Sequence, residues 1–267
     1  MNKYLSLLRP LNGIISMFGV FTGYSIAQKA FTFNLELFIG MIAAFLITGA
    51  GNVINDYYDL EIDKKLNKAI QQTKDKKLLV YSGILFATGI LISFLLNIHA
   101  VVIAIAVSVL LIAYSTIMQK YKFLGNWVVA LGTALTLIYG ASIIQNYDSI
   151  FILAGSALLA NAAREIIKDT EDLRGDSGIK TTLPMLLDFG AIKSIVLLLY
   201  SLAIILAAWA WVLGFMQGPY YILLILAAGI LFFNSWKFLR GKKFKTAQQY
   251  SKYGMIVALL AFLGGIL

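Results

Sequence analysis

The sequence predicts an all-α membrane protein that crosses the bilayer several times. Of its 267 residues, 60% are hydrophobic and only 13% are charged, about half the charge of an ordinary soluble domain. The mean hydropathy is +0.83. The apolar residues fall into runs of about 20, the length that an α-helix needs to cross the hydrocarbon layer. A soluble helical core does not hide so many such runs, so we expect a polytopic membrane protein.

Short polar segments separate the apolar runs, and no long linker or second domain interrupts them. Residues 1–267 are therefore expected to form a single domain. The first run lacks a small-residue cleavage site and further spans follow it, which favours a retained helix over a signal peptide. The nine predicted spans cover residues 11–28, 35–56, 78–96, 99–117, 125–144, 148–168, 191–213, 219–236 and 251–267, with a tight turn at Asn97-Ile98-His99 between the third and the fourth.

The basic residues predict how the chain is oriented. Cytoplasmic loops of membrane proteins are enriched in Lys and Arg. With nine spans, 21 of the 22 basic residues fall on one side, and Lys29 alone falls on the other. This distribution predicts a multi-pass protein of the cell membrane with a cytoplasmic N-terminus and an external C-terminus. It also accounts for the net charge of +9, so nucleic-acid binding is not needed to explain it.

Nine of the 13 acidic residues lie in two stretches, 51–63 and 164–176, each at the end of an apolar run. The first stretch places amides and carboxylates on one helical face, at Asn52, Asn55, Asp56, Asp59 and Asp63. The second repeats the aspartate spacing at Asp169, Asp172 and Asp176. Because the helix macrodipole disfavours acids at helix C-termini, these carboxylates point to a site and not to helix stability.

The side chains in the two stretches favour a magnesium and diphosphate site. Carboxylate and amide oxygens are the ligands that Mg²⁺ prefers. Zinc is disfavoured, because the chain has no cysteine and its single histidine, His99, falls on the opposite side of the membrane. Arg164 and Lys168, four residues apart, are candidates to bind phosphate. Lys120 is a further candidate, although membrane topology alone explains it equally well.

These residues together resemble the UbiA superfamily of intramembrane prenyltransferases. The resemblance rests on Asn55-Asp56-x-x-Asp59-x-x-x-Asp63 paired with Asp169-x-x-Asp172-x-x-x-Asp176, and it covers nearly the whole chain. Supporting marks are Arg9-Pro10-Leu11-Asn12, Tyr114-Ser115 followed by Lys120, and Gly125-Asn126. The segment from Arg164 to Asp176 most resembles the archaeal branch that transfers a geranylgeranyl group to geranylgeranylglyceryl phosphate in ether-lipid synthesis.

The resemblance implies nine helices around a central cavity whose cytoplasmic end holds two Mg²⁺ ions. Asp56 and Asp59 would bind one ion, and Asp169 and Asp172 the other, so these four aspartates are the expected catalytic residues. Asn55, Asp63 and Asp176 would complete the metal site.

The resemblance also implies an isoprenyl diphosphate donor and a lipidic acceptor, both taken from the bilayer. Arg164, Lys168 and Lys180 would hold the phosphate of the acceptor. The other expected substrate-binding residues are Asn12, Asn52, Tyr114 and Lys120. Protein partners are not predicted by the sequence.

One segment departs from the family pattern, and other functions stay open. Where the family commonly has Asn-Arg-Pro-x-Arg-Pro, this chain reads Asn67-Lys68-Ala69-Ile70-Gln71-Gln72. Within the enzymes, the alternative is a prenyltransferase that uses an aromatic acceptor in quinone synthesis. A cation transporter is disfavoured because it places carboxylates near the bilayer midplane. A scaffold protein has no reason to repeat the aspartate spacing.

Overall fold

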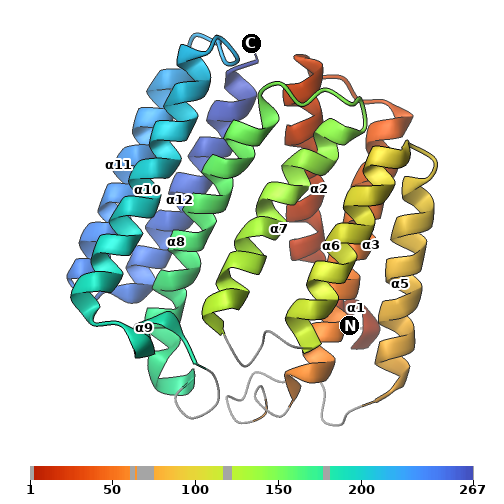
Figure 1. The fold of residues 1–267 in the computed structure, drawn as a ribbon, viewed down its shortest axis with the longest axis horizontal. Helices are drawn as coiled ribbons and strands as arrows, with labels where there is room; N and C mark the ends of the chain where they lie inside the picture. The colour runs from red at the N-terminus through yellow and green to blue at the C-terminus, as the bar shows by residue number, and fades with distance from the viewer. Residues whose placement is uncertain (1–2, 61–63, 65–74, 117–121, 177–180, 267) are drawn as a thin grey trace. The chain divides into compact units, whose positions relative to one another are not determined.

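The computed structural model describes residues 3–60, 64, 75–116, 122–176 and 181–266, which form helices joined by short loops (Figure 1). These residues contain eleven helices and no β-strand, which confirms the predicted all-α class. In chain order the helices are α1 (Lys3–Leu7), α2 (Pro10–Gln28), α3 (Leu35–Tyr58), α5 (Lys77–Ser93), α6 (Ile98–Thr116), α7 (Lys122–Ser142), α8 (Ile150–Asp176), α9 (Leu183–Leu186), α10 (Phe189–Val212), α11 (Tyr221–Arg240) and α12 (Phe244–Gly264).

Six helices in the described part of the chain are long and apolar enough to cross a membrane. They are α3, α6, α7, α8, α10 and α11, and α5 is apolar but shorter. Each of the nine predicted spans overlaps one long helix among the described residues. The seven helices just named match seven of the spans, and α2 and α12 match the first and the last. The protein is therefore a multi-pass membrane protein, whereas the count of nine spans and the orientation of the termini stay predictions.

Some helices continue beyond the apolar run that predicted them. α8 ends at Asp176 and not near residue 168, and α12 begins at Phe244 and not near residue 251. Hydropathy marks only the apolar part of a helix, whereas Lys245 and Gln248 are polar residues with good helix propensity. The second acidic stretch is therefore helical along its whole length.

Two other helix ends lie within two residues of the predicted span ends. α3 ends at Tyr58, and Asp59 is its C-cap residue, with its backbone N–H bonded to the carbonyl of Asn55 at 2.8 Å. α6 begins at Ile98, so the turn that precedes it ends at Asn97 and His99 lies in the first helical turn. Asn97 is suited to this position because its Oδ1 accepts a hydrogen bond from the Ala100 N–H at 3.0 Å, as N-cap side chains do.

The chain divides into two compact units. Unit 1 comprises residues 1–24, 32–119 and 135–146, and unit 2 comprises residues 25–31, 120–134 and 147–267. α7 contributes its first part to unit 2 and its second part to unit 1. The prediction of a single domain over residues 1–267 stays a prediction.

Small residues bring the helices of unit 1 into close contact. Ala43, Ile47 and Ala50 lie on the buried face of α3, against α5 and α6. Ser82 of α5 donates a hydrogen bond to the Ala50 carbonyl at 3.1 Å, and a side chain at Gly51 would collide with Leu111 of α6. Close approach through small residues, with hydrogen bonds between helices, is the usual way that membrane helices pack.

α2 and the second part of α7 approach each other closely. Gly19 and Gly23 follow the small-xxx-small pattern of membrane helix contacts. A Cβ atom at Gly23 would overlap the carbonyl oxygen of Leu137, and one at Gly140 would overlap that of Val20. The two backbones therefore touch without intervening side chains.

In unit 2 the buried faces of α8, α10, α11 and α12 meet in one core (Figure 1). Tyr200 of α10 stacks on Phe232 of α11 with ring centroids 4.6 Å apart, and its hydroxyl donates a hydrogen bond to Ser251 of α12 at 2.9 Å. Gly254 leaves room for the Phe232 ring. This core fixes the end of α8, which carries the second acidic stretch.

Candidate active site

In unit 1, the carboxylate of Asp56 is held by a guanidinium from another helix. Asp56 lies in the last turn of α3 and is only 4% exposed. Its Oδ1 is 2.5 Å from Nη2 of Arg9, which precedes α2. Removing a carboxylate from water is costly unless it is paired, so the ion pair explains how Asp56 stays buried.

The chain around Arg9 is shaped to make this ion pair. Arg9 has φ +48°, the left-handed conformation, and Pro10 follows it as the first residue of α2. A residue before proline is disfavoured in the right-handed helical region, so the α1–α2 junction bends at this point. Asn52 of α3 secures the junction by donating from Nδ2 to the Leu8 carbonyl at 2.9 Å.

Other predicted residues of unit 1 lie on α2, α3 and α6. Asn55 donates from Nδ2 to Oδ2 of Asp59 at 2.9 Å, and Asp59 is also buried. Asn12 approaches Asn52, with the two side chains 3.4 Å apart. Tyr114 is half-buried near the end of α6. The predicted face is therefore present as far as Asp59.

In unit 2, the corresponding carboxylate is held by a neutral amide. Asp169 of α8 is 0% exposed. Asn126, near the start of α7, donates from Nδ2 to Oδ2 of Asp169 at 2.5 Å and is itself buried. An amide can satisfy a buried carboxylate oxygen without adding a charge, so this contact differs in charge from the one that Arg9 makes with Asp56.

The two predicted phosphate-binding cations are both paired with Glu165. Its carboxylate is buried, with Nη1 of Arg164 2.5 Å from Oε1 and Nζ of Lys168 3.5 Å from Oε2. Two cations and one carboxylate leave this group with a formal charge of +1. The Arg164 side chain is mostly covered, and that of Lys168 is partly exposed. Glu165 therefore orients both cations.

The remaining predicted residues are only partly described. Asp172 is half-exposed on α8. Asp176 ends α8, but its side chain lies outside the described part of the structure, as do Asp63, Lys120 and Lys180 as whole residues. Within the described residues, no three His, Cys, Asp or Glu side chains converge on one metal position.

Three residues of the site were not among the predicted site residues. Arg9 and Asn126 lie in segments that support the family resemblance, Arg9-Pro10-Leu11-Asn12 and Gly125-Asn126, but they were given no role. Glu165 follows Arg164 directly and was counted only as an acidic residue. For Arg9 and Asn126, the available signal was a side chain with hydrogen-bond donors near the start of a helix. Such a side chain can face the carboxylates expected near the end of another helix.

The fold and the buried carboxylates define a multi-pass membrane enzyme, and the sequence places it in a known class. Residues 16–262 match the UbiA prenyltransferase family, and the chain belongs to this family. It is a prenyltransferase.

Particular relatives extend over the full length. A digeranylgeranylglyceryl phosphate synthase of Methanosphaera stadtmanae is 33% identical over 277 aligned positions that cover 100% of both chains. A solved structure described as digeranylgeranylglyceryl phosphate synthase in membranes is 30% identical, has a TM-score of 0.84 and covers 99% of this chain and 97% of its own. A UbiA homolog from Archaeoglobus fulgidus bound to GPP and Mg²⁺ has a TM-score of 0.72, covers 96% of this chain and 99% of its own and, at 18% identity, shares the fold.

The side chains present fit a magnesium ion by their chemistry. Asp56 and Asp59 are buried in unit 1, and Asp169 is buried in unit 2. All three offer hard oxygen donors, and Asp56 and Asp59 lie at the C-terminal end of α3, where the macrodipole does not favour a carboxylate. A divalent cation bound through oxygen atoms would compensate this negative charge.

Proposed function

We propose that this protein transfers a geranylgeranyl group from geranylgeranyl diphosphate to geranylgeranylglyceryl phosphate, with Mg²⁺, and so forms an ether-lipid precursor. The full-length likeness to digeranylgeranylglyceryl phosphate synthases supports this substrate pair. The structural observation that carries the proposal is the burial of two carboxylates, Asp56 in the last turn of α3 and Asp169 seven residues before the end of α8.

The aspartates would hold the metal ions. Asp56 and Asp59 would bind one ion and Asp169 and Asp172 another, with Asn55, Asp63 and Asp176 as additional ligands or hydrogen-bond partners. Bound Mg²⁺ supplies charge neutralisation, which makes the diphosphate a better leaving group. Asn126 would keep the Asp169 carboxylate oriented through the hydrogen bond that the structure contains.

The cations would recognise the acceptor. Arg164 and Lys168 would bind the phosphate of geranylgeranylglyceryl phosphate, with Lys180 as a third contact, because Arg pairs with phosphate oxygens in a fork and Lys acts as a point charge. An aromatic acceptor without a phosphate would not need this second anion site. Asn12, Asn52, Tyr114 and Lys120 are the other proposed substrate contacts.

The reaction would be a displacement at C1 of the donor. The bond from C1 to the diphosphate oxygen breaks, diphosphate leaves, and the glycerol hydroxyl of the acceptor forms the new C–O bond. The hydroxyl proton passes to a carboxylate or to water. Aromatic π-faces can stabilise the positive charge that develops on the allylic carbon, and Tyr57, Tyr58, Tyr114 and Tyr139 are candidates.

For the membrane arrangement we propose nine spans, a cytoplasmic N-terminus and an external C-terminus in the cell membrane. This topology puts both acidic stretches on the cytoplasmic side. It is supported by the positions of the basic residues and by the overlap of nine helices with the predicted spans.

A competition assay tests the acceptor. Purified protein receives geranylgeranyl diphosphate and Mg²⁺ together with geranylgeranylglyceryl phosphate and 4-hydroxybenzoate, and products are identified by mass spectrometry. We expect the diether phosphate. A prenylated ring would instead assign the protein to quinone synthesis.

Metal removal tests the metal site separately. EDTA should abolish product formation and added Mg²⁺ should restore it, because the leaving diphosphate needs its charge compensated. Full turnover in EDTA would contradict the role assigned to the aspartates.

A further inference from the structure

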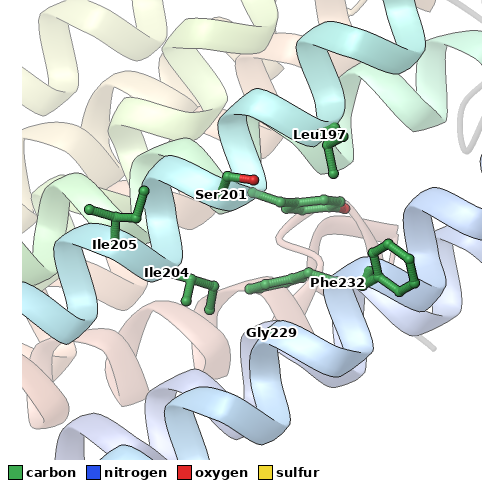
Figure 2. A pocket seen from close by; sticks show the side chains of 8 residues that line it. Leu197, Ser201, Ile204, Ile205, Gly229 and Phe232 are labelled. Atoms are coloured by element: carbon green, nitrogen blue, oxygen red, sulfur yellow. The ribbon is translucent and has the colours of Figure 1, made fainter.

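An apolar groove lies on unit 2 between α10 and α11. Figure 2 shows α10 and α11 on either side of it, with residues of each pointing into the space between them. Its volume is about 310 Å³, and its lining includes Leu197, Ser201, Ile205, Gly229, Phe232 and Phe233. Ile205 is 57% exposed and Phe233 is 55% exposed. Both helices are candidate membrane spans, so these exposed apolar side chains face the hydrocarbon of the bilayer.

Gly229 lines the groove and has no side chain to fill it. A Cβ atom at this position would find only Ile204 atoms, at 3.7 to 3.9 Å. This is an ordinary contact distance, so the glycine is not needed for helix packing. The absence of a side chain leaves space that a longer residue would fill. A substitution at Gly229 is therefore expected to fill the groove without a steric clash at the new Cβ atom.

Cations lie at one end of the groove, in line with its lining residues. On α10, Lys193 precedes Leu197 by four residues. On α11, Lys237 follows Phe233 by four residues, and Arg240 follows Phe232 by eight. Residues four apart lie on the same helical face, one turn along. α10 and α11 are consecutive and antiparallel, so the start of α10 and the end of α11 meet at this end (Figure 1).

Direct contacts connect the lining to the cations. Phe233 packs against Trp236 with ring centroids 5.6 Å apart. The Trp236 Nε1–H donates to the Lys193 carbonyl at 3.0 Å, and the Arg240 guanidinium lies 5.9 Å from the Trp236 ring centroid. Tryptophan is enriched at the level of lipid head groups. Along about two turns of α11, these contacts lead from the hydrocarbon-facing Phe233 through Trp236 to Arg240. The cations at this end, Lys193, Lys237 and Arg240, form a basic rim.

The lysine on α10 is directed toward the rim and not toward the groove. Nζ of Lys193 lies 5.2 Å from the centroid of the Phe189 ring, one turn nearer the helix start. Lysines near helix ends extend in this way so that the ammonium group reaches the membrane interface. Its charge is therefore placed where a lipid phosphate would lie.

We propose that this groove binds one anionic phospholipid, with its phosphate at Lys193, Lys237 and Arg240 and one acyl chain between α10 and α11. The charges are complementary, because phosphate pairs with a guanidinium in a fork and with ammonium groups as point charges. The lining is apolar where the chain would lie. Topology alone explains basic residues on this side, but it does not explain their alignment with a groove. The proposal does not depend on prenyl transfer.

The test measures lipid binding directly. Delipidated full-length protein in detergent is mixed with dioleoyl-phosphatidylglycerol or dioleoyl-phosphatidylcholine, and bound lipid is counted by native mass spectrometry. The first probe carries a net negative charge and the second does not. We expect one phosphatidylglycerol to bind at least tenfold more tightly than phosphatidylcholine, because three basic residues at about fivefold each give up to roughly a hundredfold preference, which screening by salt reduces.

Charge variants test the rim. The variant Lys193→Gln, Lys237→Gln and Arg240→Gln should bind both lipids alike. Its matched control removes three exposed lysines outside the groove, Lys76→Gln, Lys245→Gln and Lys252→Gln, and should keep the preference. Unchanged preference in the first variant, or equal loss in the control, would overturn the proposal.

Gly229→Leu tests the groove without changing charge, so it remains informative if the charge variant misfolds. It should weaken binding of phosphatidylglycerol roughly tenfold, because the branched side chain fills the space for the lipid chain. Gly83→Leu is the control, since nothing lies within 4 Å of a Cβ at that position. Equal binding by Gly229→Leu and wild type would contradict the proposal. Displacement of the lipid by equimolar geranylgeranyl diphosphate would also reject it, because the groove would then be a substrate subsite.

Discussion

In unit 1, the buried carboxylate of Asp56 is paired with a guanidinium from the α1–α2 junction, whereas in unit 2 Asp169 accepts a hydrogen bond from the neutral amide of Asn126. The cations of unit 2, Arg164 and Lys168, lie on the same helix as Asp169 and share the carboxylate of Glu165. The two aspartate stretches therefore share their spacing, whereas the contact described at Asp56 is with a charged group and the one described at Asp169 is with a neutral group.

This difference suggests unequal tasks for two similar sequences. At the proposed metal site, an ion bound by Asp56 would compete with the positive charge of Arg9, which would lower the metal affinity of unit 1. In unit 2, α8 itself carries two oriented cations, Arg164 and Lys168, which under the proposed function would bind the acceptor phosphate. The experiments below test this division.

The largest effect is expected where the two units should behave alike. Asp56→Asn and Asp169→Asn should each reduce turnover about a thousandfold, because the metal supplies several kcal/mol of charge stabilisation. Product formation is measured by mass spectrometry, and thermal unfolding checks that the variants fold. Glu36→Gln, an exposed acid on α3, is the control. Near-normal turnover in both aspartate variants would remove the proposed metal site.

A smaller effect should separate the units by substrate. Arg164→Gln should raise KM for geranylgeranylglyceryl phosphate about tenfold, because a hydrogen bond between charged groups contributes about 1.5–3 kcal/mol. KM for geranylgeranyl diphosphate should change little and serves as the internal control. If both KM values rise equally, Arg164 does not distinguish the acceptor from the donor.

The dependence of turnover on Mg²⁺ should change with a substitution in unit 1. Arg9→Gln should lower the Mg²⁺ concentration for half-maximal turnover by about threefold to tenfold, because the competing charge at Asp56 is removed. Arg9 is 42% exposed, so solvent screening limits the effect. Lys76→Gln is the control, and Mg²⁺ binding without substrate is measured by calorimetry. A higher requirement for Mg²⁺ would show that Arg9 binds the diphosphate instead.

The smallest effect is expected for Asn12. Its contact with Asn52 spans 3.4 Å, so Asn12→Ala should change the free energy of unfolding by less than about 0.5 kcal/mol. Asn52→Ala should cost about 1 kcal/mol, because it loses the bond to the Leu8 carbonyl. Chemical unfolding of both variants measures the difference. A larger loss for Asn12→Ala would mean that the first residues of α2 are held mainly by that side chain.

The helices were predictable because a membrane span leaves a strong local signal. Apolar runs marked every long helix, and the acidic stretches marked the ends of α3 and α8. Local composition could not show that α12 starts among polar residues or that α3 stops at Tyr58. At those points helix propensity and capping decide, and hydropathy does not report them.

The partners of the carboxylates were not predictable from one sequence. Arg9 and Asp56 are 47 residues apart, and Asn126 and Asp169 are 43 apart. Such pairs depend on which helix faces meet, and this is set by small residues such as Gly49, where a side chain would collide with Leu8. Glu165 was visible beside Arg164, but its pairing with Lys168 needed the actual direction of the side chains.

The contact between α2 and α7 has a consequence for synthesis. Gly23 meets the Leu137 carbonyl across 114 residues of chain (137 minus 23). At 5–20 residues per second, α2 leaves the ribosome roughly 6 to 23 seconds before its partner exists. During that interval its glycine face has only lipid to contact, or another helix with small residues. A newly made chain that stalls before α7 would therefore expose a surface suited to pairing with the wrong helix.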